Sequence, residues 1–253
     1  MSEAGPDGRP EGIDQAEEAR GREPIFNMPA VVVWLIAACV GVHLARLYLL
    51  DQAQDLQLIL RLAFIPERYS GRYLIDIWAF VSPFSYAFLH GGFAHLAVNV
   101  IWLAAFGSPL ANRIGAGRFL LFWAFTSLAA VGLHYVLHPL DQAPLVGASG
   151  AISGMMGAAA RFGFRIDRSK GKGAFAGRIL SIPEVFSSRM ALTFLAVWMA
   201  VNLLAGFGFG TPGGDARIAW EAHIGGFLAG FLAVRLFDRK AGMSEPPTRG
   251  GSV

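Results

Sequence analysis

The sequence predicts an all-α membrane protein with six transmembrane helices, and three observations support this prediction. The chain of 253 residues is 54% hydrophobic and only 15% charged, which is far more apolar than a soluble domain of this size. Its apolar residues gather in runs long enough to cross ~30 Å of hydrocarbon as helices. Its basic residues lie between these runs, which is typical of charges that set membrane topology.

Composition also argues against two other classes of protein. The net charge is +3 and the isoelectric point is about 9.3, but the basic residues are scattered rather than gathered with aromatics on one surface, so we expect no nucleic-acid partner. The single cysteine, Cys39, lies inside an apolar run. It excludes an intramolecular disulfide and a cysteine metal site, and we expect it to serve only in packing.

The two ends of the chain read as tails. Residues 1–28 are rich in Asp, Glu, Gly and Pro, which predicts a disordered acidic tail on the cytoplasmic side. They lack the basic start and the small-residue cleavage site of a secretory signal. Residues 239–253 are polar and are also expected to be disordered, which leaves 29–238 as the six-helix domain.

The first predicted span runs from Pro29 to Leu50, and residues 51–83 after it mix charged, aromatic and aliphatic side chains. We interpret 51–83 as an interfacial loop that carries short amphipathic helices at the headgroup level. Five more apolar runs follow. The second predicted span begins between Phe84 and His90 and ends at Leu110. The other four are Phe119 to Leu137, Val146 to Phe164, Met190 to Phe209, and Ile218 to Phe237.

Loop charges predict the orientation of these spans. The connectors 111–118 and 161–189 are basic, whereas 139–145 and 210–217 hold one arginine between them. Because Lys and Arg stay on the cytoplasmic side, we expect both termini to be cytoplasmic in a multi-pass protein of the cell (inner) membrane.

One serine stands out because small residues flank it, in Gly147-Ala148-Ser149-Gly150. A helical serine commonly bonds a carbonyl one turn back, and glycines commonly allow helices to approach closely. The alternative is that Ser149 is a nucleophile to which a substrate carbonyl has access because Gly147 and Gly150 carry no side chain. In the predicted orientation Ser149 lies about one turn below the outer surface.

His223 enters the membrane at a similar depth on the sixth span. Histidine is costly in hydrocarbon, so it is a functional candidate, although a histidine bonded to a carbonyl is the simpler alternative. Small residues recur at one-turn intervals on two spans: Ala222, Gly226 and Gly230 on the sixth, and Gly150, Gly154 and Ala158 on the fourth. If these stripes pack together, His223 comes within reach of Ser149 as its general base.

The second span supplies His95 and Asn99, four residues apart and therefore on one helix face. Two polar groups there suit an oxyanion site, although such a pair equally serves as interhelical hydrogen-bonding glue. His90 lies earlier and could cap the span.

These features resemble the rhomboid intramembrane serine proteases over about residues 29–238. The matching motifs are His90-Gly-Gly-Phe-Ala-His95-Leu-Ala-Val-Asn99, Gly147-Ala-Ser149-Gly150, and Ala222-His223-Ile-Gly-Gly226-Phe-Leu-Ala-Gly230. The resemblance implies a six-helix bundle with the fourth helix central and a water-filled cavity open to the outer side. It also implies a Ser149–His223 dyad without an aspartate, in which His95, Asn99 and the backbone N–H of Ser149 stabilise the oxyanion.

Three positions depart from the family pattern. Val81-Ser82-Pro83 stands where the family often has a Trp-Arg pair, Ala111 stands where a glutamate is frequent, and Ser153 replaces an aromatic residue that stacks on the histidine. None of these changes removes a reacting group.

We therefore expect an endopeptidase that acts on transmembrane protein substrates in the bilayer, whose cleaved helix has small or helix-weakening residues near its outer end. A catalytically silent rhomboid-like protein that binds membrane helices is the alternative, but silent relatives are expected to lack the serine or histidine. A transporter is disfavoured because no half-to-half repeat is visible. The histidines are spread over separate spans without a carboxylate cluster that resembles a zinc site, so we expect no metal and no other cofactor. The sequence leaves the oligomeric state open.

Overall fold

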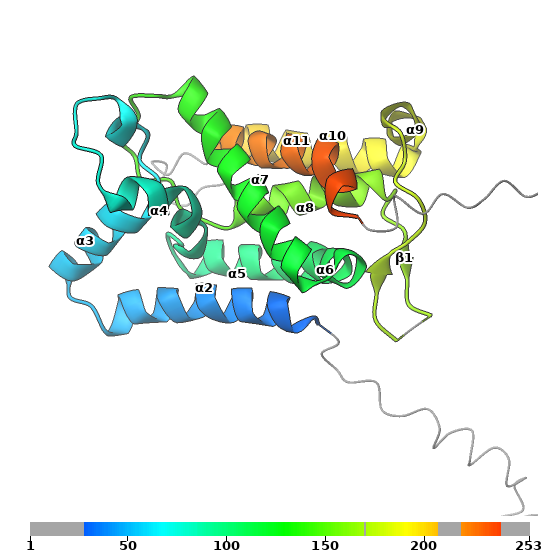
Figure 1. Cartoon of the computed structure of the whole chain (residues 1–253), viewed down its shortest axis with the longest axis horizontal. Helices are drawn as coiled ribbons and strands as arrows, with labels where there is room; N and C mark the ends of the chain where they lie inside the picture. Colours follow the sequence, from blue (N-terminus) through cyan, green and yellow to red (C-terminus); the bar gives the residue numbers. More distant parts are fainter. Residues whose placement is uncertain (1–27, 170, 207–218, 239–253) are drawn as a thin grey trace, which may run out of the picture.

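The computed structural model describes residues 28–169, 171–206 and 219–238, which are helical apart from one short β-hairpin and the connecting loops (Figure 1). The two predicted tails lie outside the described residues except for Met28. The predicted end of the fifth span at Phe209 and the start of the sixth at Ile218 also lie outside them.

Among the residues that the structure describes, three helical stretches are long and apolar enough to cross a membrane: Ala30–Tyr48, Phe93–Ile114 and Ala116–Leu137. The first is α2 and the last is α7, and both lie close to the predicted first and third spans. The chain is therefore an integral membrane protein. The remaining predicted spans correspond to the shorter helices α8 (Ser149–Arg161), α10 (Arg189–Gly206) and α11 (Trp220–Phe237), so the count of six spans stays a prediction.

The predicted short helices of residues 51–83 are confirmed as α3 (Gln52–Leu62), the 3₁₀ turn η1 (Pro66–Tyr69) and α4 (Ile77–Ser85), with the 3₁₀ turn η2 (Tyr86–Phe88) following directly. Aspartates cap both α-helices. Asp51 accepts from the Gln54 N–H at 2.9 Å, and Asp76 accepts from the Ala79 N–H at 3.1 Å. Such caps satisfy backbone donors that have no partner in the first helical turn.

The second membrane helix begins later and ends later than predicted. It consists of α5 (Phe93–Trp102), the π-helical segment η3 (Leu103–Gly107) and α6 (Ser108–Ile114), so it starts at Phe93 rather than between Phe84 and His90. It also passes the predicted end at Leu110, since Gly115 with φ 83° is the first residue that breaks it. The π-helical segment lies beside Pro109, whose missing N–H disturbs the regular bonding pattern.

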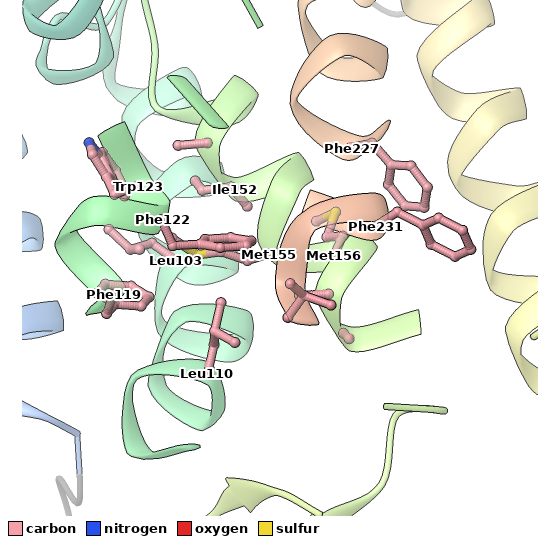
Figure 2. Close-up of a cluster of buried hydrophobic side chains, with 14 of the residues drawn as sticks. Leu103, Leu110, Phe119, Phe122, Trp123, Ile152, Met155, Met156, Phe227 and Phe231 are labelled. Atoms are coloured by element: carbon pink, nitrogen blue, oxygen red, sulfur yellow. The ribbon is translucent and has the colours of Figure 1, made fainter. Parts of the chain in front are cut away.

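Helix α8 lies at the centre of the molecule, as Figure 1 shows, and twelve of its 13 residues are buried. It is shorter than the predicted span of Val146–Phe164, because Gly147 has φ 120° before it and Gly163 and Phe164 have positive φ after it. Figure 2 shows its apolar side chains between those of α7 and α11. The labelled core residues are Leu103, Leu110, Phe119, Phe122, Trp123, Ile152, Met155, Met156, Phe227 and Phe231.

Helices α8 and α11 touch backbone to backbone along their glycines. A Cβ atom placed on Gly226 would overlap the carbonyl oxygen of Gly150, and one on Gly230 would overlap that of Gly154. An added Cβ on Gly154 would lie 2.5 Å from Cγ2 of Thr126 in α7 and 3.0 Å from the Gly226 carbonyl oxygen in α11. Only glycine fits at such a crossing, because any side chain would push the helices apart.

The basic connector after α8 contains structure that the sequence pattern did not indicate. Strands β1 (Ile166–Asp167) and β2 (Ala174–Phe175) pair antiparallel, and helix α9 (Ile182–Ser187) follows. Buried Arg161 fixes this segment, since its Nε donates to the Leu180 carbonyl at 2.8 Å and its Nη1 to the Phe231 carbonyl of α11 at 2.7 Å. The connector and the cytoplasmic end predicted for α11 are thus tied to the end of α8.

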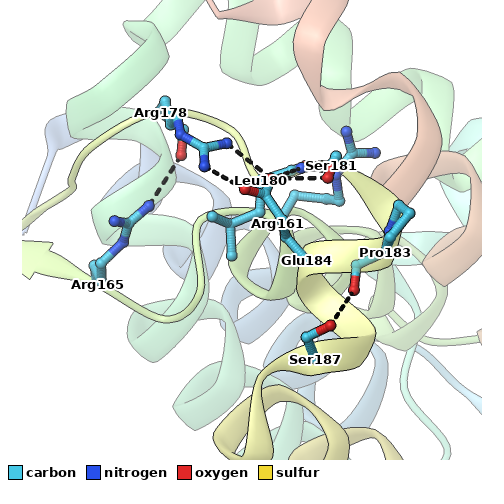
Figure 3. Close-up of polar contacts among 8 residues, drawn as sticks. All are labelled: Arg161, Arg165, Arg178, Leu180, Ser181, Pro183, Glu184 and Ser187. Atoms are coloured by element: carbon cyan, nitrogen blue, oxygen red, sulfur yellow. Dashed lines mark hydrogen bonds and ion pairs between the residues drawn. The ribbon is translucent and has the colours of Figure 1, made fainter.

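A second arginine stabilises the start of α9 (Figure 3). Arg178 forms a two-pronged ion pair with Glu184, whose carboxylate also accepts from the backbone N–H of Ser181 at 2.7 Å in a capping box. The Arg178 hydrogen bonds hold the pKa of the Glu184 carboxyl well below its usual range, and the Ser181 bonds lower it further. Because the pair is exposed, its effect on stability is small.

Candidate active site

The loop before α8 positions Ser149. The Gly147 N–H donates to the Tyr86 carbonyl at 3.0 Å, and Leu145 forms an isolated bridge with Phe64. Gly147 adopts φ 120°, a backbone conformation that disfavours side chains, and Ser149 is the first residue of α8. The serine is therefore held at a helix start whose approach is anchored to the segments after α3 and α4.

Ser149 and His223 lie in hydrogen-bond contact. The Oγ atom of Ser149 is 2.7 Å from Nε2 of His223, and both residues are partly exposed. His223 lies in the first turn of α11, and the close glycine crossing of α8 and α11 brings it to Ser149. This Oγ–Nε2 distance is the one that a hydroxyl nucleophile and its general base require.

A third side chain, Asn202 of α10, holds the other face of the imidazole. Its Oδ1 lies 2.5 Å from Nδ1 of His223, while its Nδ2 donates to the Trp198 carbonyl one turn earlier at 2.7 Å. Because that amide nitrogen is already donating, Oδ1 is the atom that faces the ring, and it accepts a hydrogen bond from the Nδ1–H group. Nε2 is thereby left unprotonated toward Ser149, the tautomer that a general base needs.

Asn202 is not among the site residues predicted from the sequence. It is one asparagine in an apolar run, and its only signal was that a buried polar residue in a predicted membrane helix needs a partner. It is 7% exposed in the structure. The resemblance implied a dyad, whereas the structure presents a three-membered chain of serine, histidine and asparagine.

His95 lies directly over Gly147. An added Cβ on Gly147 would be 2.7 Å from Nε2 of His95 and 3.6 Å from Oγ of Ser149. Nδ1 of His95 accepts from the Gly91 N–H at 3.4 Å, so in this tautomer Nε2 carries the proton. An N–H donor next to the nucleophile is what an oxyanion site needs.

Asn99 and His90 take less direct positions. Buried Asn99 donates from Nδ2 to the His95 carbonyl at 2.8 Å, within its own helix, and its Oδ1 has no hydrogen-bond partner among the described residues. Its part as an oxyanion donor stays a prediction. His90 precedes the helix, and its ring is 5.2 Å from that of His95, centroid to centroid. The His90 carbonyl accepts from Arg46 of α2 at 2.9 Å, so His90 links the site to the first helix.

The three departures from the family pattern are all accommodated by the fold. Ser82 bonds Arg68, whose Nη1 donates to its Oγ at 3.1 Å, so an arginine reaches this loop from η1. Ala111 of α6 is buried in the hydrophobic core of the protein. Ser153 is buried in α8 one turn after Ser149, and Asn202 supplies the side chain that positions the imidazole.

The expectation that the histidines lie apart, with no carboxylate cluster beside them, is wrong for two of them. His134 and His138 near the end of α7 lie beside Glu221 of α11, and one ligand atom from each of the three lies within 4.8 Å of the others. The cluster could not be predicted from the spacing of its residues, because Glu221 is 83 residues after His138. This cluster is separate from the hydrogen-bonded chain of Ser149, His223 and Asn202.

Comparison with known proteins identifies the family. A family model described as the Rhomboid domain matches residues 76–240, which is more than half of the chain. The chain therefore belongs to the rhomboid family. The matched region begins at the N-cap of α4 and contains every residue of the candidate active site.

Several curated relatives are similar to this chain at low identity. The rhomboid protease GluP of Bacillus subtilis (strain 168) is 30% identical over 156 residues, which make up 62% of this chain and 25% of GluP. RHOMBOID-like protein 5 of Arabidopsis thaliana is 29% identical over 145 residues, 57% of this chain and 40% of the relative. The rhomboid protease GlpG of Enterobacter sp. (strain 638) is 24% identical over 204 residues, 81% of this chain and 61% of GlpG. The chain thus spans less than two thirds of each of these relatives.

Proposed function

We propose that the protein is an intramembrane serine endopeptidase, which hydrolyses peptide bonds in or near transmembrane segments of other membrane proteins. The observation that carries this proposal is the chain of contacts from Ser149 Oγ through the His223 imidazole to Asn202 Oδ1, with distances of 2.7 and 2.5 Å. Relatives named rhomboid proteases support hydrolysis at the level of the family.

The reaction follows from the positions of these groups. His223 Nε2 takes the Ser149 proton as Oγ attacks the peptide carbonyl, and the developing negative charge falls near the Nε2–H donor of His95. The imidazolium then gives its proton to the leaving amine, and the acyl group remains on Ser149 Oγ. A water molecule, activated by His223 in the same way, releases the acyl group and regenerates the serine.

Asn202 acts through His223 as a positioning residue. When the imidazole is charged, its Nδ1–H still donates to Asn202 Oδ1, so one hydrogen bond holds the ring in place through both protonation states. A neutral amide oxygen stabilises the imidazolium less than a carboxylate does. We therefore assign to Asn202 the orientation of the ring rather than a charge effect.

Substrates are proposed to be single membrane-spanning helices with small or helix-weakening residues near their outer ends. A peptide bond inside a helix has its carbonyl engaged, so the helix must unwind locally before Ser149 can reach it. This proposal keeps the predicted arrangement of six spans in the cell (inner) membrane with both termini in the cytoplasm, so that Ser149 opens toward the outer side.

Incubation of detergent-purified protein with a panel of model transmembrane substrates tests the proposed activity. We expect defined cleavage products from the wild-type protein and none from Ser149→Ala, which leaves the crossing of α8 and α11 intact. Binding of the same substrates without any cleavage by the folded wild-type protein would instead identify a silent helix-binding member of the family.

A further inference from the structure

The end of α7 and the start of α11 meet in a cluster of two histidines and two carboxylates that the proposed reaction does not use. It consists of His134, His138, Asp141 and Glu221. His138 Nε2 lies 2.9 Å from one carboxylate oxygen of Glu221, and His134 Nδ1 lies 3.9 Å from the other. Glu221 and His223 are two apart on α11, so they face different sides of the helix. The cluster and the reacting groups are therefore separate sites.

We propose that His134, His138 and Glu221 bind a zinc ion that fastens the start of α11 to the end of α7. Two imidazoles and a carboxylate are a zinc-binding donor set, and histidines four apart bring their rings together at one side of a helix end. The candidate ligand atoms all lie within 4.8 Å of one another. Ligands around a tetrahedral zinc ion are ~3.3 Å apart, so small side-chain rotations close the site.

Burial distinguishes this cluster from an exposed group of charges. His134 is 4% exposed and Glu221 is 8% exposed, and Nδ1 of His134 is buried without a hydrogen-bond partner among the described residues. A buried unpaired imidazole nitrogen is costly, and a bound metal would satisfy it. The His138 side chain is 44% exposed, which gives an ion and a water ligand a route to the site.

Asp141 completes the arrangement around His134. Its Oδ2 lies 3.6 Å from Nε2 of His134, just beyond hydrogen-bond distance. If Nδ1 binds the metal, Nε2 is protonated and is placed to donate a hydrogen bond to the Asp141 carboxylate, an interaction that commonly orients metal-binding histidines. The Asp141 carbonyl also accepts from the Glu67 N–H at 3.0 Å, so the site is connected to η1.

The donor set also selects the metal. Imidazole nitrogen suits zinc and its neighbours among the transition metals, whereas calcium and magnesium prefer oxygen ligands in larger number. Zinc is therefore the probe, and calcium is the negative control.

Zinc binding is best measured on the Ser149→Ala protein, purified in detergent without a histidine tag and stripped with a chelator. This variant lacks the nucleophile, so the result does not depend on the proposed protease function. At neutral pH we expect one zinc ion per chain, no displacement by calcium, and an increase in Tm of about 5 °C at a hundredfold excess over Kd. Absence of stoichiometric zinc binding would overturn the proposal.

Variants then locate the site. Glu221→Gln and His138→Gln should each weaken zinc binding at least about 100-fold and remove the increase in Tm, while Asp141→Asn should weaken it about 10-fold. His138 is half-exposed, so its variant remains informative if Glu221→Gln does not fold. His43→Gln and His223→Ala are matched controls, because each removes a histidine outside the cluster and should retain zinc. Zinc binding that survives in both Glu221→Gln and His138→Gln, or is lost in a control, would place the ion elsewhere and contradict the proposal.

Discussion

At the scale of single residues, the imidazole of His223 is held by two atoms on opposite sides, Ser149 Oγ and Asn202 Oδ1. Its orientation decides whether Nε2 can receive the serine proton. A general base that rotates away by a small angle loses the linear hydrogen bond on which transfer depends.

Replacing Asn202 tests this orientation. Asn202→Leu should lower kcat by about 10²-fold with little change in KM, since misplacing a reacting group by ~1 Å has such an effect. Asn202→Asp keeps the acceptor, so it should retain activity, and its negative charge should move the acid limb of the pH–rate profile to higher pH because it favours the imidazolium. Steady-state kinetics across pH measures both effects. Equal kcat in wild type and Asn202→Leu would refute the positioning role.

Asn99 is predicted to act on the transition state although the structure bonds it to His95. Asn99→Ala should lower kcat, by ~10²–10³-fold if its second amide hydrogen reaches the oxyanion directly, and by less if it acts only by bracing His95. Michaelis–Menten analysis separates these cases from a binding role. A higher KM with unchanged kcat would assign Asn99 to substrate binding or helix packing.

Some residues of the candidate site could be predicted from the sequence and Asn202 could not, because only the former stand in recognisable motifs. Ser149, His223 and His95 stand in short motifs among glycines, and depth along the predicted spans placed the first two together. Asn202 stands alone among apolar residues. Whether its side chain faces His223 depends on the rotation of α10 about its axis. That rotation is set by tertiary packing, which a single sequence does not display.

At the scale of helices, the crossing of α8 and α11 is the element that assembles the site. The carbonyl oxygens of Gly150 and Gly154 lie where side chains at Gly226 and Gly230 would be. The small-residue stripes were visible in the sequence, since they need only the helical period. The exact start of α8 at Ser149 was not, because it depends on the backbone conformation of Gly147.

A single methyl group at this crossing should therefore have a large effect. Gly226→Ala should reduce stability by about 1–3 kcal/mol through overpacking and slow cleavage by about 10²-fold, because the added Cβ forces the two backbones apart. Thermal unfolding and cleavage assays report the two effects. Gly41→Ala in α2 is the control, since an added Cβ there meets no atom within 4 Å. If both variants behave like wild type, close glycine packing does not hold His223 against Ser149.

Other differences between expectation and structure also occur at element ends. The second membrane helix starts at Phe93 after Gly91 and Gly92. The β-hairpin in the basic connector was not predicted, because each of its strands has only two residues. Such short strands have no periodic pattern to detect. Long apolar runs such as Ala30–Tyr48 were predicted well because their length alone is diagnostic.

At the scale of the whole molecule, the proposed reaction site and the proposed zinc site lie on opposite sides of the first turn of α11. Glu221 faces α7, whereas His223 reaches Ser149 of α8 and Asn202 of α10. The first turn of α11 is consequently in contact with side chains from α7, α8 and α10. Interactions that fix this turn stabilise the arrangement without taking part in the reaction.

Chelation should consequently leave catalysis possible. In EDTA the protein should become less stable to heat, yet at temperatures where it stays folded it should still cleave, because the proposed zinc ligands are separate from the Ser149 and His223 pair. Cleavage assays well below the chelated protein's Tm measure this. Complete loss of cleavage by folded protein, restored by zinc, would indicate a metal-dependent hydrolysis and contradict the serine mechanism.

Covalent labelling of the purified, folded protein with a fluorophosphonate, followed by peptide mass mapping, is the decisive test of whether Ser149 is the nucleophile. An activated serine attacks phosphorus and displaces fluoride, so a single adduct should appear on Ser149 in the wild-type protein. It should be absent in Ser149→Ala and strongly slowed in His223→Ala, because the base is then missing. An adduct on a different residue, or none on folded wild-type protein, would contradict the assignment of Ser149 as the nucleophile.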